Sequence, residues 1–153
     1  GSKKNPLEND KDQNVYTKVS IFLSVFDVHV NRMPIKGSIS SIDYVPGKFI
    51  NATLDKSSKE NERNIISAKS DIGNFYIVQI AGLIARRIVC NLKINQQVEK
   101  GDRIGIIKFG SRVDLYLPEN YDILIVKGQR VIGGETIISN PNKIKEINNS
   151  NSI

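Results

Sequence analysis

The sequence predicts a small, mainly β domain with few or no helices. Short runs rich in Ile and Val recur between Gly, Pro and Asn residues, and no stretch keeps a 3.6-residue apolar period for ten residues. The composition, with 39% hydrophobic and 25% charged residues in a chain of 153, is that of one ordinary globular domain. About eight short strands imply a sheet that closes on itself or packs against a second sheet.

All of these strands are predicted within residues 15–139, which we take as the domain. They are Val19–Phe26, Gly37–Tyr44, Asn64–Ser70, Phe75–Ala81, Ile88–Asn91, Arg103–Lys108, Val113–Leu117 and Ile123–Val126. Residues 1–14, which begin with a Gly-Ser pair typical of a removed expression tag, and residues 140–153 are polar and are expected to be flexible. Asn51 to Asn64, dense in charge, Ser and Asn, is predicted to be an exposed, mobile loop.

The charge of the chain favours an anionic partner. Lys and Arg number 22 against 16 Asp and Glu, a net charge of +6. Nucleic acid is disfavoured, because no basic stretch interleaves the scattered aromatic residues as a stacking platform. The single cysteine excludes an internal disulfide, and a single Cys and a single His argue against a metal site built from these residues. No run approaches the roughly 18 apolar residues that cross a bilayer as a helix.

The only histidine lies in a strand-like segment that runs from Phe26 to Arg32. Period-2 alternation places Asp27, His29 and Asn31 on one face of this segment. His29 is therefore either a surface or hydrogen-bonded structural side chain, or a general base that is poised near neutral pH. The spacing leaves both interpretations open.

A Gly-Ser pair, Gly110-Ser111, stands between two predicted strands. By itself, such a pair indicates a β-turn or a bulge. Alternatively, a serine hydroxyl on a tight turn can attack the carbonyl of the residue before it when a base takes its proton. A preceding glycine permits the distorted backbone that this attack requires.

The segment from Met33 to Ile39 resembles the first hairpin of biotinyl and lipoyl carrier domains. This resemblance implies a compact, barrel-sandwich-hybrid-like sheet. A non-catalytic carrier or binding domain of this architecture is the alternative function, and a carrier would need a modified lysine at a hairpin tip. Asp55-Lys56-Ser57 superficially resembles a lipoyl attachment tripeptide, but Lys56 lies in the charged loop.

Four segments together resemble the pyruvoyl-dependent phosphatidylserine decarboxylases of the shorter type, over roughly residues 16–138. In the family's order, they are Ile21–Ser24, Val28–Pro34, Ala85–Ile88 and Ile107–Asp114. The resemblance implies a proenzyme that cuts itself between Gly110 and Ser111, which leaves a β chain ending at Gly110 and an α chain whose first residue, Ser111, becomes a pyruvoyl cofactor. His29 matches the family histidine that activates the serine and is implicated in decarboxylation.

The resemblance also implies the substrate, phosphatidylserine. Its amine would form a Schiff base with the pyruvoyl group and lose CO2, which gives phosphatidylethanolamine. His29 is the candidate proton donor, and a cation is needed near the lipid phosphate or carboxylate. The candidate cations are Arg32, Arg86, Arg87 and Arg112, each of which is otherwise a solvated or structurally paired charge. The implied location is the cytoplasmic face of a bacterial inner membrane, on anionic lipid, with a homodimer left open and this fragment by itself expected to be soluble.

The family also carries an upstream Ser-Pro-Ala-Asp-Gly-like motif, whose aspartate completes a processing triad with the histidine and the serine. The residues before Val15 contain no such motif, and Asn5–Asp10 is a poor substitute. We therefore expect either a natural N-terminal segment that is cut off or replaced here, or a different route of processing, with self-cleavage slow or absent. Asp27, about 6.6 Å from His29 along a strand, is too distant for an easy direct hydrogen bond. Asp114 would serve only if the fold brought it close.

Overall fold

The computed structural model describes residues 2–7, 11–23, 30–84, 87–107, 110–119, 121–126, 128–129 and 139–140. Antiparallel strands dominate these ranges, and their only helix is the four-residue α1 (Ser57–Glu60), so the prediction of a mainly β fold is confirmed. Within the same ranges, no helix has the length and apolar character needed to cross a bilayer.

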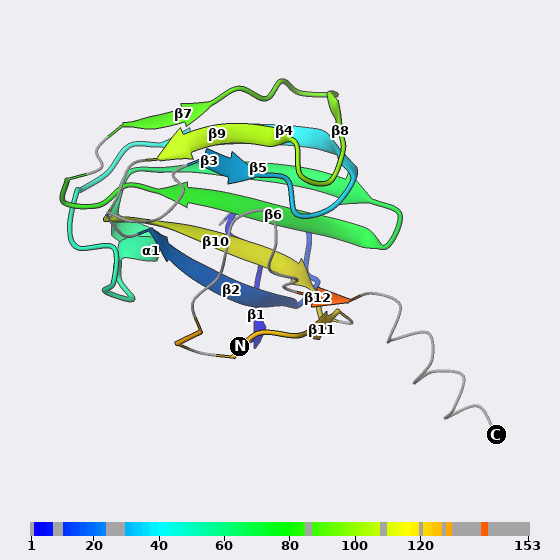
Figure 1. The fold of residues 1–153 in the computed structure, drawn as a ribbon, viewed down its shortest axis with the longest axis horizontal. Helices are drawn as coiled ribbons and strands as arrows, with labels where there is room; N and C mark the ends of the chain where they lie inside the picture. The colour runs from blue at the N-terminus through cyan, green and yellow to red at the C-terminus, as the bar shows by residue number, and fades with distance from the viewer. Residues whose placement is uncertain are drawn as a thin grey trace.

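The larger sheet has seven strands, and its spatial order is β1-β2-β10-β6-β5-β4-β8 (Figure 1). In chain order these are β1 (Ser2–Lys3), β2 (Tyr16–Leu23), β4 (Gly37–Val45), β5 (Arg63–Ser70), β6 (Gly73–Ile80), β8 (Gln97–Val98) and β10 (Ser111–Pro118). Strand β10 lies between β2 and β6, antiparallel to both, although it comes late in the chain. It is therefore held by hydrogen-bonded neighbours on both edges.

A smaller, three-stranded sheet lies over one face of the larger sheet (Figure 1). Its strands are β3 (Val30–Arg32), β9 (Arg103–Ile107) and β7 (Ile88–Cys90), with β9 in the middle. Two further strands of two residues each, β11 (Asp122–Ile123) and β12 (Ser139–Asn140), pair with each other.

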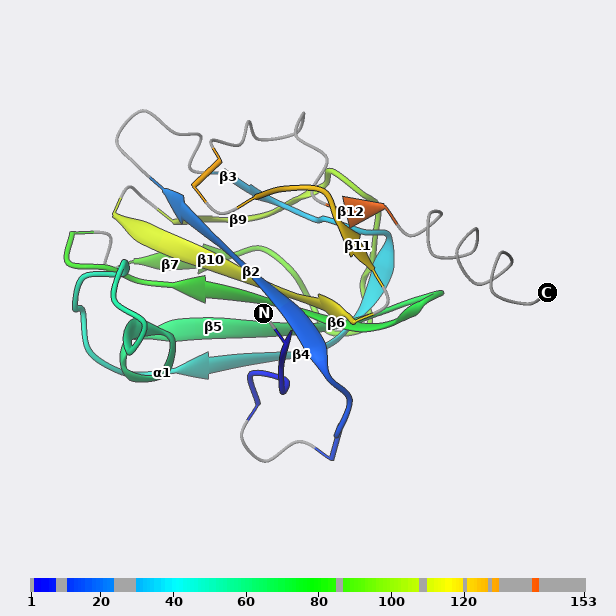
Figure 2. The same ribbon diagram turned by 90° about the horizontal axis from the view of Figure 1, so that it is seen from below.

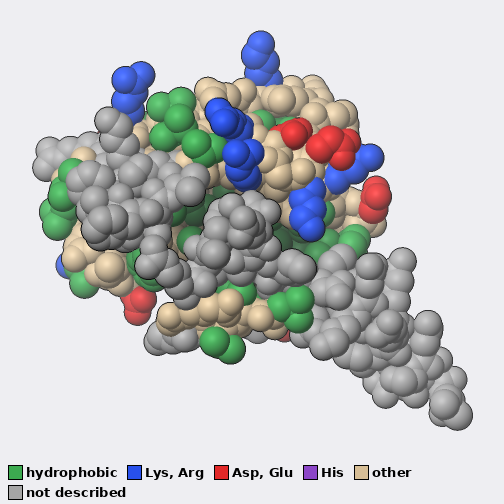
Figure 3. All heavy atoms as spheres, viewed as in Figure 1, with side chains coloured by type: hydrophobic (Ala, Val, Ile, Leu, Met, Phe, Trp, Pro, Cys, Tyr) green, Lys and Arg blue, Asp and Glu red, His purple; other side chains and the backbone are tan. Residues whose placement is uncertain are grey.

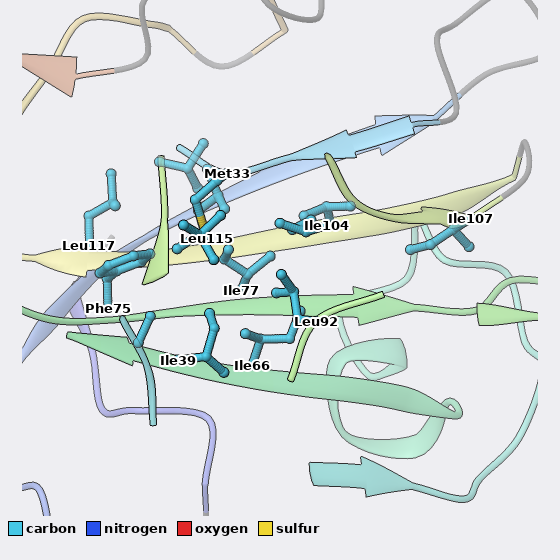
Figure 4. Close-up of a cluster of buried hydrophobic side chains, with 14 of the residues drawn as sticks. Met33, Ile39, Ile66, Phe75, Ile77, Leu92, Ile104, Ile107, Leu115 and Leu117 are labelled. Atoms are coloured by element: carbon cyan, nitrogen blue, oxygen red, sulfur yellow. The ribbon is translucent and has the colours of Figure 1, made fainter. Parts of the chain in front are cut away.

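The main hydrophobic core lies between the two sheets (Figure 4). Met33, Ile104 and Ile107 contribute from the smaller sheet and the residue that follows β3, and they pack with Ile66 and Ile77 of the larger sheet. Burial of such aliphatic side chains is the dominant favourable term in folding, so these contacts hold the sheets together.

Successive residues of β10 alternate between the two faces of the larger sheet. Val113 and Leu115 belong to the core between the sheets, whereas Tyr116 belongs to a second cluster on the opposite face. The period-2 geometry of a strand produces this division. This alternation decides which of the residues that follow Gly110 can face the same site.

The opposite face carries three tyrosines. Part of the N-terminal segment lies beside β2 (Figure 2). Tyr76 makes edge-to-face ring contacts with both Tyr16 and Tyr116, and Leu7 packs against this cluster. Asp12 accepts hydrogen bonds from the hydroxyls of Tyr16 and Tyr76. Thus, a stretch expected from its composition to be flexible makes defined contacts with the sheet.

Two expectations about local structure need correction, and three short strands lay outside the predictions. The predicted strand Ile123–Val126 is wrong beyond Ile123, because no described strand pairs with the residues that follow it. The short strands β1, β8 and β12 were not predicted, since two-residue strands depend on their partners and not on their own composition. Asn51 to Asn64 is not wholly an exposed loop, since it contains α1 and buries Asn61, whose side chain bonds the carbonyls of Ile50 and Ala81.

Candidate functional site

The Gly110–Ser111 peptide bond lies at the start of β10. Gly110 has φ +78°, a left-handed conformation that glycine adopts without the strain a Cβ would cause. Its N–H donates a hydrogen bond to the carbonyl of Leu23 at 2.6 Å. Ser111 is the first residue of the strand and is 1% exposed. The bond is therefore fixed on both sides, by the hydrogen bond of the Gly110 N–H before it and by strand pairing after it.

Gly82 makes room for the carbonyl of Gly110. A Cβ atom at residue 82 would lie 1.8 Å from the carbonyl oxygen of Gly110 and 2.8 Å from its carbon, distances at which the backbone would have to move. Sequence reasoning missed this role of Gly82. The available signal was a glycine two residues after the end of the buried strand β6, where close approach of another backbone is a common cause.

Ser111 faces the space between the two sheets. It pairs with Leu23, a core residue of that space, and it shares a face with Val113. Two buried polar side chains that sequence reasoning did not single out for chemistry, Asn31 and Gln79, lie in the same space and are hydrogen-bonded to each other. The interior beside Ser111 is therefore partly polar.

Arg112 points away from Ser111, into the opposite face. Its guanidinium donates to the carbonyl of Ala52 at 3.0 Å and to the hydroxyl of Ser58, and it lies 5.7 Å from the ring centroid of Phe22. It is 2% exposed. Arg112 therefore attaches the segment before α1 to the sheet, and its role in substrate binding stays a prediction.

Asp114 is also on that opposite face. Its Oδ1 lies 2.9 Å from Nε of Arg112, its Oδ2 accepts a hydrogen bond from the same guanidinium at 3.1 Å, and Lys18 Nζ lies 3.6 Å away. Both carboxylate oxygens are thus engaged with cations. The fold does not bring Asp114 to the side of Ser111, so Asp114 is not the acid that could complete a triad there.

The other predicted site residues are distributed as follows. Arg32 is exposed and donates to the carbonyl of Gly101 at 2.9 Å, at the end of the smaller sheet away from Ser111. Arg87 is exposed and precedes Ile88, the first residue of β7. His29 and Arg86 lie outside the described residues. Figure 3 shows Lys and Arg side chains spread over this side of the molecule, with Asp and Glu among them.

Lys56 does not have the geometry of a carrier lysine. It stands at the N-cap position of α1, where its side chain makes no capping hydrogen bond, and the turn before it is bound by Arg112. It lies in the long connection between the paired strands β4 and β5, beside a helix, and not on the short hairpin turn that the carrier interpretation requires. No observation therefore favours the alternative of a carrier domain.

Comparison with known proteins gives a consistent result. A model of the phosphatidylserine decarboxylase family matches residues 2–139. The chain is 54% identical over 136 residues to a "Phosphatidylserine decarboxylase proenzyme" of Wolbachia sp. subsp. Brugia malayi (strain TRS), which covers 88% of this chain and 59% of that protein. Proteins of the same name from Ehrlichia chaffeensis (strain ATCC CRL-10679 / Arkansas) and Pelagibacter ubique (strain HTCC1062) are 58% identical over 123 residues and 53% identical over 135.

These relatives are longer than the chain. The matched part covers 54% of the Ehrlichia chaffeensis protein and 62% of the Pelagibacter ubique protein, and 79% and 88% of this chain. The chain thus spans less than two thirds of the length of the relatives that it matches. In each relative the matched part, which includes the Gly110–Ser111 bond, belongs to a longer polypeptide.

Proposed function

Because the chain belongs to the phosphatidylserine decarboxylase family, we propose that it is the catalytic part of a phosphatidylserine decarboxylase proenzyme that cuts itself between Gly110 and Ser111. The observation that carries this proposal is the conformation of that bond. Gly110 has a positive φ, its carbonyl lies against Gly82, and the next residue is a buried serine. An ordinary β-turn would not require all three features.

The cleavage begins with attack of the Ser111 hydroxyl on the carbonyl carbon of Gly110, which forms an ester as the C–N bond breaks and the Ser111 nitrogen takes up a proton. Elimination of the Gly110 carboxylate, with loss of the Ser111 α-proton, then separates the two chains, and water displaces ammonia from the dehydroalanine left at residue 111 to give the pyruvoyl group. The hydroxyl must lose its proton to a base, and His29 is the base that the sequence offers. The N–H of Gly110, bonded to Leu23, and the contact with Gly82 hold the reacting carbonyl in place. Such positioning lowers the barrier because reacting atoms need not be brought together from solution.

Ser111 fits the requirements for a precursor of a pyruvoyl group. After cleavage it would be a chain end held between β2 and β6, in a space from which water is largely excluded. A pyruvoyl group there would supply an electron sink for the decarboxylation of an amino acid headgroup. The protein's own part is to bury this position, to keep the strand end fixed and to provide a proton donor.

Arg87 is our candidate for the cation that binds the lipid phosphate or carboxylate. It directly precedes Ile88, and Ile88 pairs with Ile107 of β9. Ile107 in turn lies three residues before Gly110 in the chain. Arg32 lies at the other end of the smaller sheet, beside Gly101. Arg87 is therefore nearer in the fold to the position where a lipid headgroup would react.

We also propose that the end of the molecule at which β10 begins meets an anionic membrane. Three segments place exposed apolar side chains there: Phe22 of β2, Leu54 of the turn bound by Arg112, and Leu83 and Ile84 after Gly82, with exposed fractions of 44–65%. Figure 3 shows hydrophobic side chains at the left edge, the end where β10 begins in Figure 1. Exposed apolar groups combined with a net charge of +6 suit an anionic lipid surface. A position at the cytoplasmic face of an inner membrane stays a prediction.

The cleavage is tested by intact mass under denaturing conditions after prolonged incubation at neutral pH, with Ser111→Ala as the control. Two chains that separate after Gly110, the smaller starting as pyruvoyl, would support the proposal. If the 153-residue chain stays uncut, the same measurement is made on a longer version that includes the additional sequence its relatives carry. An uncut longer chain would overturn the proposal, and cleavage followed by release of CO2 from phosphatidylserine would establish the activity.

Membrane binding is tested by flotation with phosphatidylserine vesicles. We expect binding that weakens with salt and that is reduced by the double substitution Leu83→Asp and Ile84→Asp. The control is Ile94→Asp, which changes an equally exposed residue in the turn between β7 and β8. Equal loss of binding in the control, or comparable binding to oligonucleotides, would contradict this placement of the membrane surface.

A further inference from the structure

A buried amide side chain joins the two sheets beside Ser111. Gln79 lies on β6, is 0% exposed, and reaches from the larger sheet to the smaller one. Its Nε2 donates to Oδ1 of Asn31 at 2.9 Å and to the carbonyl oxygen of Val89 at 3.2 Å. Asn31 belongs to β3 and Val89 to β7, so one side chain binds both outer strands of the smaller sheet.

The middle strand of the smaller sheet leaves space for this amide. Gly105 of β9 pairs with Asn31 on one side and with Cys90 on the other. A Cβ atom at Gly105 would lie 2.7 Å from Nε2 of Gln79 and 2.0 Å from the carbonyl oxygen of Val89. Any larger residue at this position would push the amide or the β7 backbone away, so all three strands accommodate Gln79.

The hydrogen bonds specify an amide and also its orientation. Both partners of Gln79 in the smaller sheet are acceptors, whereas its partner in the larger sheet is a donor: Asn64 Nδ2 donates to Oε1 at 3.1 Å. A buried polar group that lacks such partners is costly, and a buried carboxylate at this position could not donate to Asn31 or Val89. Glutamine satisfies all of these partners at once, whereas leucine would satisfy none.

The bridge joins the strand that begins with Ser111 to β3, which follows His29 in the sequence. Gln79 pairs with Val113, and Ser111 is on the same face two residues earlier, which makes Ser111 a diagonal neighbour about 7–8 Å away. On the other side, Asn31 follows His29 by two residues, and the alternation predicted from the sequence assigns them to one face. One bridge therefore links the strand that begins with Ser111 to the strand that follows the histidine.

We infer that Gln79 is a positioning residue, which holds β3 and β7 of the smaller sheet in one register over the strand that begins with Ser111. Two sheets held only by aliphatic packing can slide past each other at small cost, whereas paired buried amides define one register. The expected effect of Gln79 on the cleavage rate rests on the proposed function. The expected effect of Gln79 on the imidazole resonances of His29 does not depend on whether the chain cleaves.

The experiment compares Gln79→Leu with Asn64→Leu. Asn64 is a matched control because it is a buried amide of the same cluster, but its bond to Gln79 stays within the larger sheet. Three quantities are measured in the full chain: the thermal unfolding midpoint, the NMR resonances of the imidazole ring, and the rate of cleavage by intact mass. The chain has one histidine, so the imidazole signal reports on His29 alone. If Gln79→Leu does not fold, Gln79→Met, which keeps an unbranched side chain, takes its place.

Both substitutions should lower the unfolding midpoint. Only the change at Gln79 should shift the imidazole resonances and slow cleavage, by about 100-fold, the loss that a misplacement of roughly 1 Å can cause. Unchanged resonances at Gln79→Leu, or an equal shift at Asn64→Leu, would overturn the inference and leave Gln79 a purely structural residue. If the resonances respond as expected but no form of the chain cleaves, the positioning role holds and the proposed function fails.

Discussion

Ser111 and Arg112 are neighbours in sequence, but their side chains lie on opposite faces of the seven-stranded sheet. Ser111 faces the space between the sheets, whereas Arg112 binds Asp114 and the segment before α1. Strand alternation imposes this separation. A lipid headgroup that reaches residue 111 from the space between the sheets would therefore not meet the guanidinium of Arg112.

The role of Arg112 leads to a prediction about stability. Arg112→Leu should lower the free energy of unfolding by about 3–5 kcal/mol, because it leaves the buried carboxylate of Asp114 without its main partner. Urea unfolding of the chain measures this change. The control, Arg32→Ala, removes an exposed arginine and should change the unfolding free energy by less than about 0.5 kcal/mol. Similar small effects of both substitutions would contradict the structural role of Arg112.

Gly82→Ala should slow the cleavage after Gly110 by about 100-fold, because the added Cβ would displace the Gly110 carbonyl by more than a small adjustment. Intact mass against time measures the rate. Gly37→Ala is the matched control: its Cβ would lie 2.6 Å from the carbonyl oxygen of Lys69, at the opposite end of the larger sheet. Both substitutions should destabilise the fold. Equal cleavage rates in the two variants would show that the contact between Gly82 and Gly110 is unimportant for the reaction.

The two cleavage products should stay together under native conditions. Strand β10 pairs with β2 along its whole length and with β6 over most of it, and both neighbours belong to the other product. Size-exclusion chromatography should give one peak with the volume of the uncut chain, while a denaturing gel of the same peak shows two chains. Separation of the products in native buffer would contradict the observed pairing.

Two tyrosines should titrate at unusually high pH. Burial, with a hydrogen bond to Asp12, raises the pKa of Tyr16 to about 12, and burial, with the nearby Asp114 carboxylate, raises the pKa of Tyr116 to about 12. In the unfolded chain both have pKa values of about 10. Their stabilising contribution is thus complete below pH 10 and is lost as the pH rises through about 12, because the unfolded chain gives up these protons first.

Alkaline titration of tyrosinate absorbance measures these ionisations. Tyr16→Phe and Tyr116→Phe should each remove part of the step near pH 12. A single step near pH 10 in the wild-type chain would mean that neither hydroxyl is buried as described.

The strands with strong apolar patterns were predictable from the sequence, and those formed by their partners were not. Gly37–Tyr44 and Asn64–Ser70 were placed to within one residue, since alternating and continuous runs of Ile, Val and Ser carry a clear signal. Strand β8, of two residues, exists because it pairs with the start of β4. Asn61 and Ser57 were expected to be exposed, because composition cannot show that their side chains bond backbone groups in the interior.

The candidate site also has features that the sequence predicts and features that only the tertiary structure shows. From the sequence alone came the family resemblance, the Gly110–Ser111 pair and His29, because these depend on residue type and order along the chain. The opposite orientations of Ser111 and Arg112, the contact of Gly82 with Gly110, and the bridge from Gln79 to Asn31 were decided only by the tertiary structure. Each joins residues from strands far apart in sequence, and strand pairing and sheet packing bring them together. No local pattern records such contacts.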